Sequence, residues 1–223
     1  MPRPYYQDEA VTIYHGDCRE ILPLLPEKSV DLVLTDPPYN VGINYASNVD
    51  DNLPIDEYDR RIRELKTLCP CSDWAILLGS KTETLLTWWQ NFANAKMIIV
   101  RVGATVNTSL HGFRPQYRAI LTTRKSHKWW SDLWEDVRFP GEGYFFNEER
   151  FDHPCHAPLR LMHKLVECLS FTDEVILDPF GGIGTTLRAA KDLGRKCIGI
   201  EIEEKYCEIA ANRCRQMVMD LKI

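Results

Sequence analysis

Residues 36–39, Asp-Pro-Pro-Tyr, follow a short apolar run and combine three features that could do chemistry. Proline fixes its own φ and holds the preceding residue extended, and Pro38 has no N–H to donate. The Asp36 carboxylate and the Pro37 carbonyl are therefore expected to form a rigid pair of acceptors beside the flat ring of Tyr39. A flat heterocycle with an amino group fits these features, because two acceptors on its N–H bonds localise the nitrogen lone pair. We expect this stretch to activate the amine of adenine or cytosine; the structural alternative is a strand ended by Pro-Pro with a surface tyrosine.

A glycine-rich turn with a distant acid forms a second candidate site. Residues 174–190 read as a strand, a turn and a helix that begins near Thr185. Gly182 and Gly184 would let the backbone approach a ligand, and the helix N-terminus offers free N–H donors. Glu201 lies 19 residues after Gly182, where a carboxylate can accept hydrogen bonds from both hydroxyls of a ribose. The pattern predicts a nucleoside ligand, and a nicotinamide cofactor is the competitor, although its third glycine is replaced here by Leu187.

Short apolar runs alternate with helical patterns along the chain, and most of the runs end in an acid or a glycine. This alternation predicts an α/β fold with a doubly wound, mostly parallel sheet covered by helices on both faces. No repeat or Gly/Ser linker divides the chain, so we predict a single domain over residues 1–223. Ligands of such sheets bind beyond the carboxyl ends of the strands. Four acids stand at these predicted ends: Asp17, Asp36, Asp178 and Glu201. The predicted strands are 10–17, 29–36, 72–80, 95–103, 117–124, 173–182 and 195–202, and the predicted helices are 18–25, 81–93 and 203–221.

The composition is that of a folded globular protein, with 44% hydrophobic and 26% charged residues. No apolar run is long enough to cross a bilayer, and residues 1–10 lack a signal-peptide pattern, so we expect a cytoplasmic protein without a membrane partner. The eight cysteines fall without a disulfide framework, as reduced intracellular cysteines do. Cys-Pro-Cys at 69–71 and His-Pro-Cys-His at 153–156 contain no CxxC pair, so we expect no metal.

Charge is distributed unevenly, although the net charge is only −5. Residues 84–131 contain no Asp or Glu, whereas the rest of the chain has 20 basic and 32 acidic residues. The seven basic residues of this segment are Lys96, Arg101, Arg114, Arg118, Arg124, Lys125 and Lys128. Such asymmetry is expected of a protein that turns one side to nucleic acid, and a solvated basic face without a partner is the alternative. We predict DNA contacts from Arg114, Arg124, Lys125 and Lys128.

Three stretches together resemble a known family: residues 16–42, 153–186 and 194–213. In content and order they resemble the β group of S-adenosylmethionine-dependent DNA amino-methyltransferases, in which the catalytic motif precedes the cofactor motif. The resemblance implies a Rossmann-like methyltransferase sheet with permuted motif order and a small inserted recognition region. It also implies that Asp36, Pro37, Pro38 and Tyr39 are catalytic.

The same resemblance implies a set of residues that hold S-adenosylmethionine. Asp17 would contact its adenine, and His153 and Pro154 would shape the pocket for its methionine end. Two departures concern that end: Cys-His-Ala-Pro at 155–158 replaces the usual Thr-Gln-Lys-Pro, and Ile183 replaces a serine of the glycine turn. The remaining residues expected to hold the cofactor are Asp178, Phe180, Gly182, Gly184, Thr185 and Glu201.

We therefore expect methyl transfer from S-adenosylmethionine to the N6 amine of adenine in duplex DNA, with the base flipped out of the helix and stacked on Tyr39. Cytosine-N4 methylation is the nearest alternative, since an Asp before Pro-Pro-Tyr favours adenine only as a tendency. A catalytically silent nucleic-acid-binding subunit and an RNA substrate are further alternatives. We expect residues 40–58 to form a mobile catalytic loop and residues 124–152 to read the target. A homodimer would widen the DNA footprint, and the sequence does not reveal whether a cognate nuclease exists.

Overall fold

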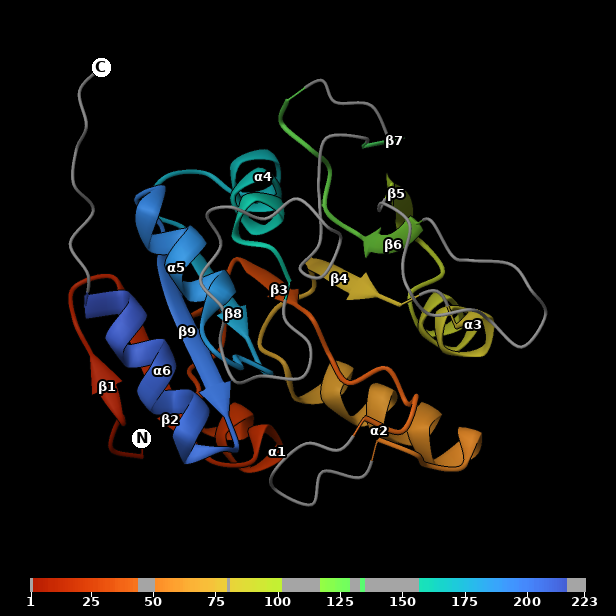
Figure 1. The fold of residues 1–223 in the computed structure, drawn as a ribbon, viewed down its shortest axis with the longest axis horizontal. Coiled ribbons are helices and arrows are strands. Elements are labelled where there is room, and N and C mark those ends of the chain that lie inside the picture. Colours follow the sequence, from red (N-terminus) through yellow and green to blue (C-terminus); the bar gives the residue numbers. More distant parts are fainter. Residues whose placement is uncertain are drawn as a thin grey trace.

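The computed structural model describes residues 2–43, 51–79, 81–101, 117–128, 133–134 and 157–215. Within these residues the strands form one nine-stranded sheet in the order β1-β2-β9-β8-β3-β4-β6-β5-β7 (Figure 1). The strands are β1 (Tyr6–Gln7), β2 (Val11–His15), β3 (Leu32–Thr35), β4 (Trp74–Leu78), β5 (Lys96–Arg101), β6 (Tyr117–Thr122), β7 (Leu133–Trp134), β8 (Val175–Asp178) and β9 (Lys196–Glu201).

Helices connect the strands on both faces of the sheet. They are α1 (Cys18–Ile21), followed by the 3-10 turn η1 (Leu22–Leu24), α2 (Ile55–Leu68), α3 (Thr82–Asn91), α4 (Leu159–Leu169), α5 (Thr185–Asp192) and α6 (Glu204–Arg215). The start of α2 illustrates the local rules: Pro54 precedes the first turn, and Asp56 and Glu57 within it complement the positive end of the helix dipole.

Alternate residues of the central strands feed two hydrophobic cores, one on each face. In β3, Leu32 and Leu34 belong to one core and Val33 to the other. Because successive side chains of a strand point to opposite faces, a buried strand needs apolar residues at every position. The first core packs α4, α5 and α6 against the sheet, and the second packs α1, α2 and α3. Figure 1 shows these two helical layers on either side of the sheet.

The predicted α/β fold with a mostly parallel sheet is confirmed. The pairs β2–β9, β9–β8, β8–β3 and β3–β4 are all parallel. Their carboxyl ends lie at one edge of the sheet, which we call the carboxyl edge, and their starts lie at the amino edge. By contrast, β6 is antiparallel to both β4 and β5, so β6 begins at the carboxyl edge and ends at the amino edge.

Two predictions of local structure are wrong. Residues 55–58 were expected in a loop, but they form the first turn of α2, because Tyr58 is a buried residue of this helix. No strand was predicted after residue 124 and before residue 173, but β7 lies in this range and pairs with β5. Trp134 of β7 is buried in the first core, which explains why so short a strand is held in place.

No helix among the described residues is long and apolar enough to cross a membrane. The division of the chain into one domain with a recognition region at 124–152 stays a prediction, since most of that region lies outside the described residues.

Candidate functional site

A cavity of about 390 Å³ lies at the carboxyl edge of the sheet, a size within the usual range for small-molecule sites. The ends of β2, β9, β8 and β3 meet there because these strands are parallel neighbours. The structure thus brings together residues that the sequence spreads over 185 positions. The predicted site residues that line this cavity are Asp17, Asp36, Pro37, Pro38, Tyr39, Asp178, Phe180, Gly182, Thr185 and Glu201.

The turn at residues 36–39, which we call the catalytic turn after its predicted role, places Asp36 and Tyr39 side by side. The Tyr39 hydroxyl donates a hydrogen bond to Asp36 Oδ1, and the Tyr39 side chain is largely buried. Asp36 keeps some exposure toward the cavity, but burial of its carboxyl raises its pKa, while the charge of Arg118 and the bond from Tyr39 act in the opposite direction. In this structure the acceptor predicted for an amine already accepts one hydrogen bond.

Backbone oxygens of the catalytic turn are fixed from two helices. Tyr58 Oη of α2 donates to the Pro38 carbonyl at 2.9 Å, and Trp88 Nε1 of α3 donates to Tyr58 Oη at 2.9 Å. Thr84 Oγ1 of α3 donates to the Tyr39 carbonyl at 2.7 Å. The turn is therefore held by side chains of α2, which precedes β4 in the chain, and of α3, which follows it.

Asp51 binds the backbone N–H groups that follow Tyr39. Its carboxylate accepts hydrogen bonds from the N–H groups of Asn40, Val41 and Ile43 at 2.6, 3.2 and 2.9 Å. Asn40 adopts a positive φ of 56°, which asparagine tolerates better than most residues, and its side chain exchanges two hydrogen bonds with the backbone of Leu53. These contacts tie together the two described ends of the predicted catalytic loop, whose residues 44–50 lie outside the described residues.

Asp178 ends β8 beside the end of β3. Its Oδ1 accepts from Thr35 Oγ1 at 2.7 Å and from the Phe180 N–H at 3.1 Å. Burial raises the pKa of Asp178 to about 6, and hydrogen bonds from Thr186, Thr35 and Phe180 oppose this rise. Asp178 and Asp36 are close enough for the charge of Asp36 to contribute to the raised pKa.

Gly182 and Gly184 both adopt positive φ, at 50° and 77°, but they differ in role. Gly182 lines the cavity. Gly184 caps α5 and is absent from the cavity wall among the described lining residues; a Cβ there would lie 2.7 Å from Cβ of Ala210 in α6. The lack of a side chain at Gly184 lets α6 pack closely, and its expected part in holding the cofactor stays a prediction.

Glu201 closes the other end of the cavity. Its Oε2 accepts from the Gly182 N–H at 2.7 Å and its Oε1 accepts from the Glu203 N–H at 2.8 Å. Burial raises the pKa of Glu201, and these backbone hydrogen bonds oppose the rise. Because each carboxylate oxygen has two lone pairs, the Glu201 carboxylate keeps capacity for a further donor such as a ribose hydroxyl.

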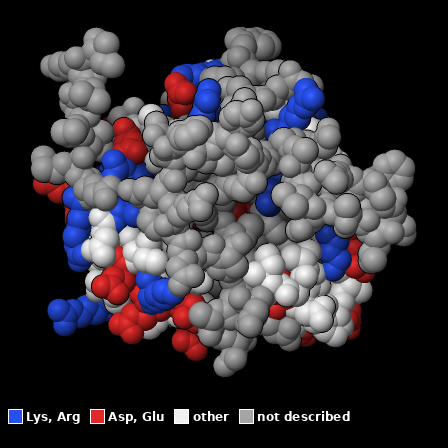
Figure 2. Space-filling view, in the orientation of Figure 1, with Lys and Arg blue, Asp and Glu red and all other residues white. Residues whose placement is uncertain are grey.

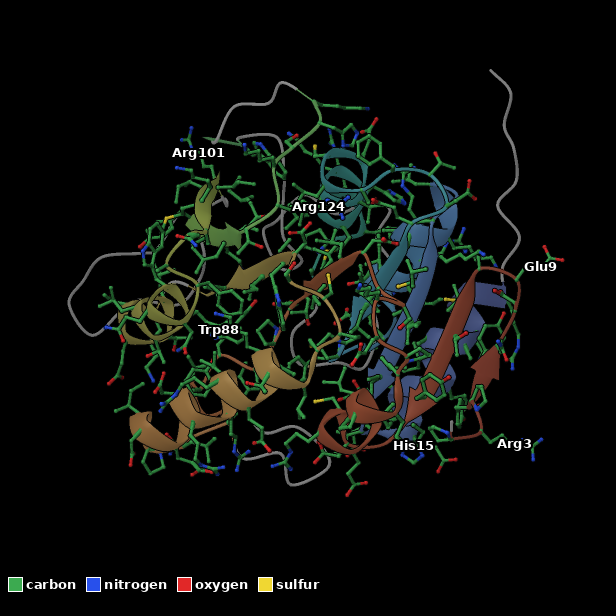
Figure 3. The ribbon with its side chains drawn as sticks, turned by 180° about the vertical axis from the view of Figure 1, so that it is seen from behind. Arg3, Glu9, His15, Trp88, Arg101 and Arg124 are labelled. Atoms are coloured by element: carbon green, nitrogen blue, oxygen red, sulfur yellow. The ribbon has the colours of Figure 1, made fainter. Side chains whose placement is uncertain are left out.

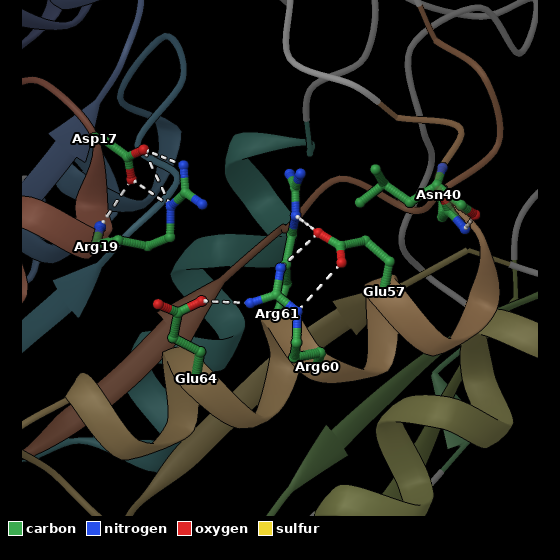
Figure 4. A network of polar contacts seen from close by, with 8 residues as sticks. Asp17, Arg19, Asn40, Glu57, Arg60, Arg61 and Glu64 are labelled. Carbon is green, nitrogen blue, oxygen red and sulfur yellow. Dashed lines mark hydrogen bonds and ion pairs between the residues drawn. The ribbon is translucent and has the colours of Figure 1, made fainter.

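Asp17 caps α1 and is engaged by Arg19, as Figure 4 shows. Arg19 Nη2 lies 2.5 Å from Asp17 Oδ2, and the Arg19 N–H donates to Oδ1 at 2.9 Å. The Arg19 hydrogen bond is the largest cause of the lowered pKa of Asp17, and the charge of Arg61 in α2 adds to it. Arg61 pairs with Glu57 at 3.2 Å and also lines the cavity (Figure 4).

The predicted DNA contacts Arg124, Lys125 and Lys128 lie at the amino edge, after the end of β6. Arg124 donates to the Asp31 carbonyl, just before β3, at 2.8 Å and pairs with Glu174, just before β8, at 2.5 Å. Its side chain is only 14% exposed, so Arg124 stabilises strand starts on the side of the sheet away from Asp36. Figure 3 shows Arg124 and Arg101, which belong to opposite ends of the β5–β6 pair.

Lys128 pairs with Glu167 of α4 at 2.5 Å, and Lys125 is exposed at the same edge. The described cations of the segment 84–131 thus lie at both edges of the sheet, and the DNA contacts expected from Arg124, Lys125 and Lys128 stay predictions. Figure 2 shows basic and acidic side chains interspersed over the described part of one face, around α6.

Arg114, His153 and Pro154 lie outside the described residues, so their predicted roles stay predictions. Within the part of the chain that the structure describes, no group of three or more His, Cys, Asp or Glu side chains could hold a metal ion.

Four residues that the sequence did not single out belong to the site: Asp51, Tyr58, Arg61 and Arg118. Arg118 carried the only sequence signal, as one of the cations of the acid-free segment. Arg118 Nη1 donates to Tyr39 Oη at 3.1 Å across 79 positions of sequence. The others are ordinary residues of a loop and a helix until the fold brings them to the catalytic turn.

Comparison with known proteins gives consistent similarities. A family model described as DNA methylase matches residues 76–212. The type II methyltransferase M.ScaI of Streptomyces caespitosus is 26% identical over 96% of this chain and 84% of its own length. The DNA adenine methyltransferase YhdJ of Escherichia coli is 26% identical over 93% of this chain and 84% of its own length.

Two solved structures have similar folds. TTHA0409 of Thermus thermophilus, in complex with S-adenosyl-L-methionine, has a TM-score of 0.62 at 25% identity, with 90% of this chain and 91% of that chain covered. The cytosine-N4-specific PvuII DNA methyltransferase has a TM-score of 0.75 at 17% identity, with 99% and 90% covered.

Proposed function

The chain belongs to the DNA methylase family, and from this premise we propose that it transfers a methyl group from S-adenosylmethionine to the N6 amine of adenine in duplex DNA. As a member of this family it is an S-adenosylmethionine-dependent DNA amino-methyltransferase, acting on adenine N6 or cytosine N4. One observation carries the finer proposal. The same cavity is lined by Glu201, a carboxylate that suits ribose hydroxyls, and by Asp36, a carboxylate that suits an amine.

The cavity residues fit S-adenosylmethionine. Glu201 lines the cavity with acceptor capacity for ribose hydroxyls, and Phe180 and Tyr206 offer apolar surface for a flat ring. Carboxylates such as Asp178 suit a ligand that bears positive charge on its sulfonium and ammonium groups. When bound, the cofactor supplies an electrophilic methyl group.

The chain's own residues position and polarise the amine. Asp36 and the Pro37 carbonyl accept the two N–H bonds of the target amine, which localises the nitrogen lone pair. The nitrogen–carbon bond forms as the carbon–sulfur bond breaks in line, and the surplus proton leaves the methylated nitrogen for the Asp36 carboxylate. Holding both reactants in the orientation for reaction lowers the activation barrier by several kcal/mol.

A base inside a duplex cannot reach a carboxylate enclosed at a sheet edge, so the target base must leave the stack. We propose that Tyr39 contacts the flipped base. In the free protein its ring packs over Gly79, where a Cβ would lie 3.2 Å from Tyr39 Cδ2, and its hydroxyl bonds Asp36. Entry of the base must therefore displace or share that hydrogen bond.

Two observations favour adenine over cytosine. The residue before Pro-Pro-Tyr is Asp36, which in this family accompanies adenine more often than cytosine. YhdJ, similar over 93% of this chain, is described as an adenine methyltransferase. The likeness to the cytosine-N4 enzyme concerns the fold, at 17% identity.

The test is transfer of a radiolabelled methyl group to unmethylated duplex DNA, followed by chromatography of the nucleosides. We expect labelled N6-methyladenine from the wild type and none from Asp36→Asn, which keeps the shape but loses the charge. Labelled N4-methylcytosine would show that the target is cytosine and not adenine. Label on RNA alone would show that the substrate is RNA and not DNA. Absence of label on every substrate, with intact cofactor binding, would support a silent DNA-binding subunit.

Base flipping has its own readout in DNA that carries 2-aminopurine at the target position, once the target sequence is known. The fluorescence of this base should rise on binding, because unstacking removes its quenching. A homodimer that widens the footprint stays a prediction, checked by sedimentation of the protein with and without DNA.

A further inference from the structure

Three side chains form a connected polar group at the catalytic turn. Arg118 Nη1 donates to Tyr39 Oη at 3.1 Å, and the Tyr39 hydroxyl donates its own proton to Asp36 Oδ1. The guanidinium carbon of Arg118 lies 5.5 Å from the centre of the Tyr39 ring, within the range of a cation–π contact. The charge of Arg118 thus acts on Asp36 both directly and through the tyrosine.

The strand directions explain why this arginine reaches the turn. Arg118 is the second residue of β6, and β6 begins at the carboxyl edge because it runs antiparallel to β4, with Ala119 opposite Leu78. Gly79 follows Leu78 and has no side chain, so the Tyr39 ring can lean over it toward β6. An added Cβ at position 79 would lie 3.2 Å from Tyr39 Cδ2, so the glycine permits this close packing of the ring.

From this geometry we infer that Arg118 is a positioning residue of methyl transfer: it holds the Tyr39 hydroxyl at Asp36 and supplies the positive charge that an enclosed carboxylate needs to stay ionised. The inference rests on the proposed role of Asp36 as acceptor of the amine. A protonated Asp36 would carry a donor where the amine needs an acceptor, and it could not take the surplus proton.

The electrostatic surroundings of Asp36 support this role. Burial raises the pKa of Asp36, and the charge of Arg118 is the largest influence that lowers it, ahead of the hydrogen bond from Tyr39. The other charged neighbour on the adjacent strand is Asp178 of β8, a carboxylate that disfavours a second negative charge. Arg61 and Tyr58 of α2 face the same cavity. Among these groups, Arg118 is the cation hydrogen-bonded to the Tyr39–Asp36 pair.

Two substitutions separate the effect of the charge of Arg118 from the effect of its hydrogen bond to Tyr39. Arg118→Met removes the charge and keeps the length, whereas Arg118→Lys keeps the charge but loses the planar fork that spans to Tyr39. Lys96→Met is the matched control, because Lys96 is an exposed cation at the amino-edge end of the neighbouring strand β5. Each variant is assayed for single-turnover methyl transfer to DNA from pH 5 to pH 9, and for cofactor affinity by calorimetry.

For Arg118→Met we expect a rate at pH 7 that is lower by about tenfold or more, because the hydrogen bond that positions Tyr39 is lost. We also expect a higher pH midpoint of activity than in the wild type, since removal of the positive charge lets the pKa of Asp36 rise. Arg118→Lys should keep the wild-type midpoint with a lower rate. Lys96→Met should match the wild type in both. Cofactor affinity should stay within about twofold in all three, given that Arg118 lies on the catalytic side of the cavity.

An unchanged pH midpoint in Arg118→Met would overturn the inference. If that variant does not bind cofactor and is misfolded, Arg118→Lys decides, because a wild-type rate there would show that the bond to Tyr39 is dispensable. Carbon-13 NMR of labelled aspartate carboxyls, with Asp36→Asn as the assignment standard, follows the ionisation of Asp36 without any activity. If the wild type methylates no base, the proposed function is wrong. If the pKa of Asp36 is the same in Arg118→Met as in the wild type, only this inference is wrong.

Discussion

Several carboxylates line one cavity, and the immediate partners of Asp17, Asp36, Asp178 and Glu201 give these four different pKa values. Arg19 lowers the pKa of Asp17, burial raises the pKa of Asp178 to about 6, and burial raises that of Glu201. Burial raises the pKa of Asp36, and the charge of Arg118 opposes this rise. A cavity with so many acids is costly for the free protein and favourable for a cationic ligand, which is what a sulfonium cofactor offers.

The raised pKa of Asp178 predicts how stability depends on pH. The pKa rises from 3.8 in the unfolded chain to about 6 in the folded protein, so the folded state holds this proton more tightly. The stabilisation is fully present below pH 3.8 and is lost as pH rises through about 6, a change on the order of 3 kcal/mol. Asp178→Asn keeps an acceptor for Thr35 but cannot titrate.

Denaturant unfolding of the cofactor-free protein at pH 4, 5, 6 and 7 checks this prediction. The difference in the free energy of unfolding, wild type minus Asp178→Asn, should fall steadily from pH 4 to pH 7. Groups that do not interact with Asp178, such as Asp8, whose pKa is lowered to about 2, change both proteins equally and cancel. The contributions of Asp36 and Glu201 cancel only in part, because their charges interact with that of Asp178. A difference that is flat with pH would mean that Asp178 titrates at its ordinary pKa.

At the level of elements, the sequence predicts the strands better than their order and direction. Asp36 and Tyr39 could be predicted because two prolines fix their local geometry, and Glu201 because its spacing from Gly182 reflects a strand–helix–strand unit. Arg118 could not, because its contact with Tyr39 depends on β6 running antiparallel to β4, and short apolar runs do not encode direction. The same reversal carries Arg124 to the amino edge.

The packing of α5 against α6 gives a prediction about Gly184. Alanine there must adopt a φ of 77° and would bring its Cβ within 2.7 Å of Ala210 Cβ, so both strain and overlap oppose it. Gly42 is a matched control, with a φ of 80° and nothing within 4 Å of an added Cβ. We expect Gly42→Ala to cost about 1 kcal/mol through backbone strain alone, and Gly184→Ala to cost about 2 kcal/mol or more beyond that.

Urea unfolding of both glycine variants gives these two free energies. The double variant Gly184→Ala/Ala210→Gly should recover part of the loss, because it removes the atom that the new Cβ meets. Equal losses for the two single variants would show that α6 moves aside without cost.

At the scale of the whole molecule, the two edges of the sheet carry different tasks. The carboxyl edge holds the cavity and the catalytic turn, whereas the cations at the amino edge pair with acids that precede strands or lie in α4: Arg124 with Glu174, and Lys128 with Glu167. Under the proposed function, duplex DNA approaches the carboxyl edge to deliver a base to Asp36. We therefore predict that the cations of the acid-free segment differ in role according to the edge at which each lies.

Strand β5 offers a paired test of this division, because it has an exposed cation at each end: Lys96 at the amino edge and Arg101 at the carboxyl edge. We expect Arg101→Met to weaken binding to all duplex sequences and to make the salt dependence of log K shallower by about 1, the loss of one phosphate contact. Lys96→Met should leave both unchanged. The triple variant Arg124→Met/Lys125→Met/Lys128→Met should lower the free energy of unfolding, because it removes the ion pair that joins strand starts, and should not change the salt slope. Binding isotherms at several salt concentrations give the salt slope of all three variants. A shallower slope in the triple variant with no effect of Arg101→Met would place DNA at the amino edge, away from the cavity and Asp36.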